Sequence, residues 1–189
     1  MKKDTVKKIY LGVAFFLVLC ATCFSGCIST EKTAQVDQTL HEWMDTEMTD
    51  VVTGDSFTLR ELTKDGVPIV VHLYATWCPY CNMQLTESTT FLANYPEKAH
   101  LVVIDIDASE TPEKIANHVK DKKYGGTFAT AEVPIMQGLM ELFGQEAITG
   151  GVPQTILFSG ENILYLGSGV IGSNNLADRL DAMQQQLVK

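Results

Sequence analysis

The chain has 189 residues, of which 46% are hydrophobic and 20% charged, a balance that favours a globular domain over a disordered or fibrous chain. Its 14 Lys and Arg residues stand against 23 Asp and Glu residues, giving a formal net charge of −9. This charge argues against a nucleic-acid-binding protein, because such proteins need a basic face for the phosphates.

The first 26 residues have the pattern of an export signal. Four lysines precede an apolar run that ends at Phe24, and this order is typical of a secretory signal peptide. Residues 24–27 (FSGC) resemble a prokaryotic lipobox, which implies cleavage before Cys27 and lipid attachment to that cysteine. An uncleaved membrane anchor and a freely secreted protein are the alternatives. All three place the domain outside the cytoplasm, and lipidation places it at the extracytoplasmic face of the membrane.

Residues 27–48 are predicted to form the lipid-attached cysteine and a polar tether, and residues 49–189 to form the domain. The domain is expected to open with a hairpin, in which residues 50–52 and 56–59 flank the turn Thr53-Gly54-Asp55.

A buried strand and a helix are predicted next. Residues 68–75 (PIVVHLYA) form a nearly continuous apolar run rich in β-branched residues, which predicts a strand buried on both faces of a sheet. Residues 79–94 have helical apolar spacing, and Pro96 ends the helix. The expected buried positions of this helix are Met83, Leu85, Phe91 and Leu92.

The remaining chain alternates between strand and helix patterns. Residues 109–122 read as a helix with Thr111 as its N-cap and Pro112 at its first position. The other predicted elements are strands at 100–106, 127–131, 154–158 and 163–167, a helix at 135–143 that Gly144 ends, and a helix at 174–187. This alternation predicts an α/β sheet covered on both faces, finishing in an antiparallel hairpin.

Cys78 and Cys81 are the candidate reactive groups. They are the two thiols left if residues 1–26 are removed and Cys27 is lipidated. A disulfide between cysteines so close in sequence closes only a short loop and therefore stabilises the fold little. An exported protein with one such pair is predicted to use the pair for chemistry.

The predicted strand and helix place Cys78 at a helix N-terminus. Free N–H groups and partial positive charge there stabilise a thiolate, so we expect the pKa of Cys78 to lie below its ordinary value of about 8.5. Pro79 suits the first helical position. Cys81 lies on the same helical face, which predicts that Cys78 attacks a disulfide and that Cys81 resolves the mixed disulfide.

Residues 75–81 (ATWCPYC) resemble the active site of a thioredoxin-fold oxidoreductase, with Trp77 before the motif as in thioredoxins and Pro79-Tyr80 inside it as in glutaredoxins. The segment from Phe57 to Cys81 and the long insertion before residues 154–158 resemble the membrane-attached cytochrome-maturation type, the TlpA/ResA-like group. The resemblance implies a thioredoxin fold: a central mixed sheet with helices on both faces, an N-terminal hairpin and an insertion before the cis-proline strand.

Residues 151–155 (GVPQT) resemble the cis-proline loop of that family. The resemblance implies a cis Val152–Pro153 bond beside the two cysteines, where the main chain of Val152 would pair with a substrate peptide. Trp77, Pro79 and Tyr80 are predicted to complete the substrate-binding surface with Val152 and Pro153.

His72 is a departure from the family pattern. It lies six residues before Cys78, where thioredoxins carry a buried Asp, and Gln84 stands where the cytochrome-maturation type often has Glu. We hypothesise that His72 accepts the proton of Cys81 when the mixed disulfide resolves, since the pKa of imidazole lies near neutrality. A hydrogen-bonded core histidine with no part in turnover is the alternative.

The function predicted from these features is that of an extracytoplasmic thiol–disulfide oxidoreductase that reduces protein disulfides. Its redox group would be the Cys78–Cys81 pair, with no metal or further cofactor. Client protein thiols and a membrane or extracytoplasmic redox partner are the expected partners. The alternatives are a disulfide oxidase or isomerase, a copper-binding thioredoxin-fold chaperone, and a peroxidase, which would have Thr in place of Ala75.

Overall fold

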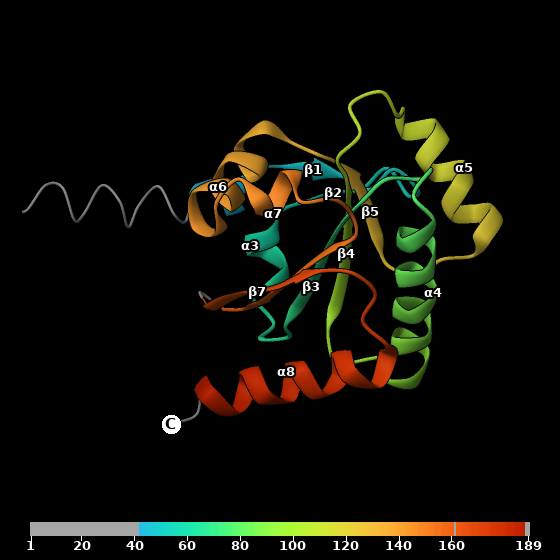
Figure 1. Cartoon of the computed structure of the whole chain (residues 1–189). Helices are drawn as coiled ribbons and strands as arrows, with labels where there is room; N and C mark the ends of the chain where they lie inside the picture. Colours follow the sequence, from blue (N-terminus) through green and yellow to red (C-terminus); the bar gives the residue numbers. More distant parts are fainter. Residues whose placement is uncertain (1–41, 161, 188–189) are drawn as a thin grey trace, which may run out of the picture. The chain divides into compact units, whose positions relative to one another are not determined.

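The computed structural model describes residues 42–160 and 162–187. Their main feature is a five-stranded mixed sheet with the strand order β5-β4-β3-β6-β7 (Figure 1). Strands β3, β4 and β5 run parallel, and β6 and β7 each run antiparallel to their neighbours. The bounds are β3 (Ile69–Tyr74), β4 (His100–Asp105), β5 (Thr127–Thr130), β6 (Gln154–Ser159) and β7 (Asn162–Ser168).

Strand β3 is the centre of this sheet, and all six of its residues are buried. The predicted strand buried on both faces is therefore confirmed. Burial of one large aliphatic side chain stabilises the fold by roughly 1.5–3 kcal/mol. The central position, which buries both faces of the strand, is therefore the most favourable one for this apolar run.

Helices cover both faces of the sheet, as predicted (Figure 1). One face packs against α4 (Pro79–Asn94), α5 (Pro112–Lys122) and α8 (Ser173–Leu187). The other face packs against the 3-10 helix η1 (Trp43–Asp45), α3 (Leu59–Leu62) and α6 (Val133–Phe143). The short helix α7 (Glu146–Thr149) follows α6 and precedes the loop that leads into β6.

Local capping signals explain where several helices begin and end. The hydroxyl of Thr111 accepts a hydrogen bond from the Lys114 amide at 3.2 Å, which confirms the predicted N-cap of α5. Gly144 follows the last residue of α6, as expected. Thr58 and Glu61 form a capping box that starts α3, a one-turn helix that was not predicted.

Two local predictions are wrong in detail. The N-terminal hairpin exists, but its strands are β1 (Met48–Thr49) and β2 (Ser56–Phe57), so residues 50–52 belong to the connection. The Asp50 carboxylate accepts a hydrogen bond from the Val52 amide, which favours a turn over an extended strand. Met83 was expected to be buried but is 55% exposed, because Cys81, Leu85 and Phe91 define the buried face of α4.

The folded domain begins earlier than the sequence indicated. Residues up to 48 were assigned to the tether, yet Trp43, Met44 and Met48 are buried in the core on the α6 face. Three apolar residues in a short polar stretch do not form a sustained helix or strand period, which is why the sequence pattern did not predict this contribution. The predicted signal peptide, Cys27 and residues 28–41 of the tether lie outside the described residues. None of the helices in the described ranges combines the length and hydrophobicity needed to cross a bilayer.

Candidate active site

The two cysteines lie where β3 gives way to α4. Cys78 is the N-cap of α4, Pro79 is its first residue, and Cys81 lies one turn further on. The Cys81 amide donates a hydrogen bond to the Cys78 sulfur at 3.3 Å, so the free N–H groups of the helix start are directed at that sulfur. Both cysteines are present as thiols; Cys78 is 5% exposed and Cys81 is fully buried. Burial and a hydrogen bond with Cys78 raise the pKa of the Cys81 thiol.

The loop before β6 meets this helix start. The Val152–Pro153 bond is cis, as the resemblance implied. The Cys78 thiol donates a hydrogen bond to the Val152 carbonyl oxygen at 3.4 Å, so residues 74 positions apart in the sequence are in direct contact. Pro153 itself is buried, whereas Val152 is partly exposed.

Aromatic side chains border the cysteines on the outside. Trp77 and Tyr80 are each 64% exposed, which is unusual for large apolar groups. The Trp77 indole N–H donates a hydrogen bond to the Asp107 carboxylate at 2.7 Å, which orients the ring. Pro79 is also exposed. The structure therefore brings the five predicted substrate-surface residues to the surroundings of Cys78.

His72 lies on the face of β3 that packs against α4, and its ring is fully buried. Its Nδ1 is 3.1 Å from the Thr155 hydroxyl and its Nε2 is 2.8 Å from the Ser88 hydroxyl. Burial lowers the pKa of His72 to about 4, so the ring is neutral near pH 7. Both ring nitrogens thus bond hydroxyl groups rather than the Cys81 sulfur.

Gln84, the residue that stands where the cytochrome-maturation type often has Glu, is buried on α4. Its side-chain amide is buried and bridges to the segment before α8: the amide donates to the Ile171 carbonyl at 3.2 Å and accepts from the Ile171 amide at 2.6 Å. The same amide donates to Ser88, which in turn contacts His72. This polar chain runs through the middle of an otherwise apolar layer.

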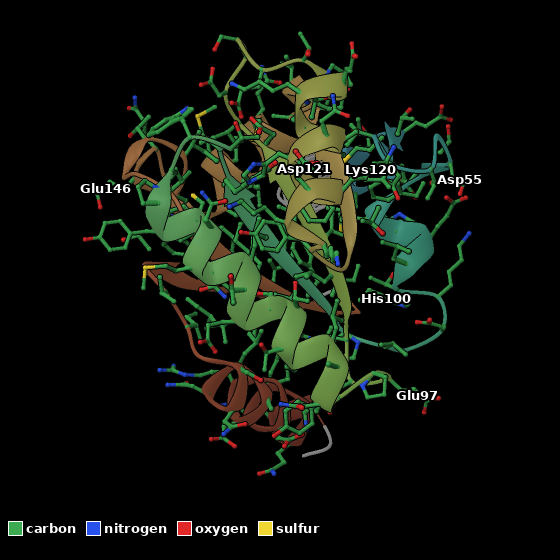
Figure 2. The ribbon with its side chains drawn as sticks, turned by 90° about the vertical axis from the view of Figure 1, so that its right-hand side faces the viewer. Asp55, Glu97, His100, Lys120, Asp121 and Glu146 are labelled. Carbon is green, nitrogen blue, oxygen red and sulfur yellow. The ribbon has the colours of Figure 1, made fainter. Side chains whose placement is uncertain are left out.

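Two polar groups beside the cysteines were missed by the sequence reasoning. Asn82 donates a hydrogen bond from its side chain to the Cys78 carbonyl at 3.1 Å and contacts His118 of α5 at 2.7 Å. Helices α4 and α5 lie side by side on the face seen in Figure 2, and this contact joins them.

The second missed group is a pair of buried acids, Asp105 and Glu110. Glu110 accepts a hydrogen bond from the Thr76 amide at 2.8 Å and pairs with Lys114 at 2.5 Å. Asp105 ends β4 and is 3% exposed. A carboxylate inside a run predicted to be a buried strand (HLVVIDI) was the signal available in the sequence.

Comparison with known proteins agrees with this geometry. The thioredoxin family model, described as "Thioredoxin", matches residues 48–120. No significant match was found among curated proteins. Among solved structures, a secreted Mycobacterium tuberculosis disulfide oxidoreductase homologous to E. coli DsbE is similar, with a TM-score of 0.55 and 17% identity, covering 75% of this chain and 98% of that one.

Two further solved structures give the same result. A thiol:disulfide interchange protein of the thioredoxin family from Chlorobium tepidum has a TM-score of 0.59 and 18% identity, covering 73% of this chain and 91% of that one. StoA from Bacillus subtilis has a TM-score of 0.53 and 18% identity, covering 69% and 92%. The matched segment and these structural neighbours agree on the thioredoxin fold. The described domain has the thioredoxin fold, and the segment that matches the thioredoxin family model contains both cysteines of the CxxC motif.

Proposed function

We propose that this protein is an extracytoplasmic, lipid-anchored thiol–disulfide oxidoreductase that reduces disulfides in client proteins. The observation that carries the proposal is the placement of Cys78: its sulfur accepts the Cys81 amide at the start of α4 and contacts the carbonyl of the cis-proline loop. Helix-terminal N–H groups favour the thiolate, which is the form that attacks a disulfide.

The proposed reaction takes place in two exchange steps. The Cys78 thiolate attacks a client disulfide, a bond forms between Cys78 and one client sulfur, and the other client sulfur leaves as a thiolate. Cys81 then loses its proton and attacks Cys78, which releases the second client thiolate and leaves a Cys78–Cys81 disulfide. The client gains two electrons and the protein loses two, so a redox partner must reduce the protein again. The cysteine pair is the redox group, and no further cofactor takes part.

The surroundings of Cys78 suit an extended client segment. Trp77, Pro79 and Tyr80 supply exposed apolar surface on one side. The Val152 main chain on the other side would pair with the client backbone. His72 remains a candidate proton acceptor for Cys81 under this proposal.

Reduction of insulin disulfides by dithiothreitol, followed by turbidity, tests the activity. We expect the wild type to accelerate the reaction and Cys78→Ser to abolish the acceleration. Cys81→Ser should retain the first step and accumulate a mixed disulfide visible by mass spectrometry. Equal activity of Cys78→Ser and wild type would refute the proposal.

The reduction potential of the pair tests the direction of electron flow. A value near about −270 mV indicates a reductant, and a value near about −120 mV indicates an oxidant. For the anchor, labelled palmitate should be incorporated into the wild type expressed in bacteria and not into Cys27→Ala. Equal labelling of the two would refute lipidation of Cys27.

A further inference from the structure

The Asn82 side chain holds the turn that carries Cys78. Its Nδ2 donates hydrogen bonds to two main-chain carbonyls of this turn, that of Cys78 at 3.1 Å and that of Thr76 at 3.4 Å. The Cys78 carbonyl also accepts the main-chain amide of Asn82 at 3.2 Å, which is the hydrogen bond that opens α4. Asn82 therefore fixes the peptide group that follows Thr76 and the one that follows Cys78.

The partners of Asn82 determine how its amide group is oriented. Because Nδ2 faces two carbonyl oxygens, which only accept, the amide donors must point at the turn. Oδ1 then faces Nε2 of His118 at 2.7 Å and the Tyr124 hydroxyl at 3.3 Å. An amide oxygen only accepts, so Nε2 of His118 carries a proton and donates it. His118 thus orients Asn82 from α5, which lies beside α4 (Figure 2).

A second contact holds the same turn. The Glu110 carboxylate accepts the Thr76 amide at 2.8 Å and the Thr76 hydroxyl, and it pairs with Lys114 at 2.5 Å. Lys114 and His118 are four residues apart on α5, so they lie on one face of that helix. This face of α5 therefore anchors both side chains that hold the turn, Glu110 and Asn82.

The position of the turn determines what the Cys78 sulfur meets. The sulfur accepts the Cys81 amide at 3.3 Å and lies 3.4 Å from the Val152 carbonyl oxygen. A hydrogen bond from an amide is stronger when the sulfur is a thiolate, because the acceptor then carries a charge. A turn that moved away from the Cys81 amide would therefore destabilise the thiolate relative to the thiol.

We propose that Asn82, oriented by His118, is a positioning residue for the attack by Cys78. This inference rests on the proposed oxidoreductase function. Asn82 exchanges no proton and forms no bond with the client. It acts through the main chain of the turn, and it keeps the Cys78 sulfur at the amide of Cys81 while the bond to the client sulfur forms.

Two substitutions of His118 test whether its hydrogen bond carries the effect. His118→Ala removes the donor, whereas His118→Gln keeps one, because the Gln Nε2 lies as many bonds from Cα as the His Nε2. The rate at which 5,5′-dithiobis(2-nitrobenzoate) first releases nitrothiobenzoate measures the attack by Cys78. We expect His118→Ala to slow this release by about fivefold at pH 7, the factor that corresponds to the net contribution of one hydrogen bond. His118→Gln should restore it.

The equilibrium with glutathione provides a second readout. The dithiol form loses thiolate stabilisation in His118→Ala, so the equilibrium should shift towards the Cys78–Cys81 disulfide, and His118→Gln should reverse the shift. Asn117→Ala, which changes the exposed neighbour of His118 on α5, should alter neither the rate nor the equilibrium.

The outcomes separate positioning from simple packing. The His118 ring also packs on Tyr124, with the ring centroids 5.8 Å apart. If packing were its only role, His118→Ala would lower the Tm but leave the rate and the equilibrium as in wild type, and this result would overturn the inference. An equal loss of rate in His118→Ala and His118→Gln would also overturn it, because the donor would then have no effect.

Asn82→Leu keeps the proposal testable if His118→Ala folds poorly. Leucine is similar in size to asparagine but donates nothing to the two carbonyls, so the first release should again be slower than in wild type. A wild-type rate in Asn82→Leu would contradict the assignment. A wild type in which Cys78 does not react with the reagent, or which does not reduce insulin, would instead overturn the proposed function itself.

Discussion

The hydrogen bonds of the buried His72 ring determine which of its two nitrogens carries the proton. The Ser88 hydroxyl accepts a hydrogen bond from Gln84, which leaves its own proton to be donated to Nε2 of His72. We therefore assign the proton of the neutral ring to Nδ1, which donates to Thr155. This pairing holds α4 against β3 and β6 whether or not His72 takes part in turnover.

The stability of the protein should report the protonation state of His72. Its folded pKa is about 4 and its ordinary value is 6.5, so between these values the unfolded chain binds a proton that the folded protein excludes. Stability from this group is complete above pH 6.5 and is lost as the pH falls towards 4, by about 3 kcal/mol in all.

Urea unfolding of wild type and His72→Gln between pH 7 and 4 measures this loss. Glutamine does not titrate, so the difference in unfolding free energy between the two proteins should change with pH in favour of the variant. A constant difference over that range would show that His72 does not remain neutral in the fold.

At the scale of elements, α6 depends on a close contact with η1. A Cβ added at Gly138 would lie 2.3 Å from the Trp43 ring, far inside van der Waals contact. The ring packs edge to face on Phe158 at a centroid distance of 6.0 Å, so it has little room to move. The glycine is needed at this helix position because it allows the indole to approach the backbone.

Gly138→Ala should therefore destabilise the protein despite the better helix propensity of alanine. Propensity alone favours the change by roughly 1 kcal/mol, whereas overpacking costs about 1–3 kcal/mol, and more for a rigid neighbour. Thermal unfolding should show a lower Tm for Gly138→Ala and a Tm close to wild type for Gln137→Ala, an exposed neighbour on α6. A raised Tm for Gly138→Ala would contradict the packing of Trp43.

The limits of helix α4 were easier to predict from the sequence than the residues on its buried face. Its predicted limits, residues 79–94, agree with the structure, because Pro79 and Pro96 frame it. Its buried face, however, includes Gln84 and Ser88, which hydrophobic spacing cannot identify. Polar residues are buried there because partners from distant segments satisfy them.

On the scale of the whole molecule, the two sides of the sheet differ: one contains the reactive cysteines and the other contains a structural core. The side packed against α4, α5 and α8 contains the cysteines, His72 and Asp105. The opposite side has a mostly apolar core, which includes Trp43, Met44 and Met48 from the start of the described domain. Residues 43–48 thus support the sheet from the side away from the reactive sulfurs.

A chain that starts at residue 49 should accordingly be less stable than one that starts at residue 38. It loses three buried side chains, and removal of one buried Trp alone costs about 3–5 kcal/mol. Chemical denaturation of the two purified chains measures the difference. Equal midpoints would show that residues 43–48 do not belong to the core.

Much of this protein could be determined from its sequence. The order of strands and helices, the helix start at Cys78 and the cis-proline loop follow from apolar periodicity, capping residues and motif resemblance, all of which depend on neighbours in the chain. Only the tertiary structure decided that Asp105 is buried, that Asn82 joins α4 to α5, and that Trp43 packs on Gly138. The reason is physical: burial and hydrogen-bond partnership depend on residues that are distant in sequence, and local patterns carry no record of which distant residues will meet.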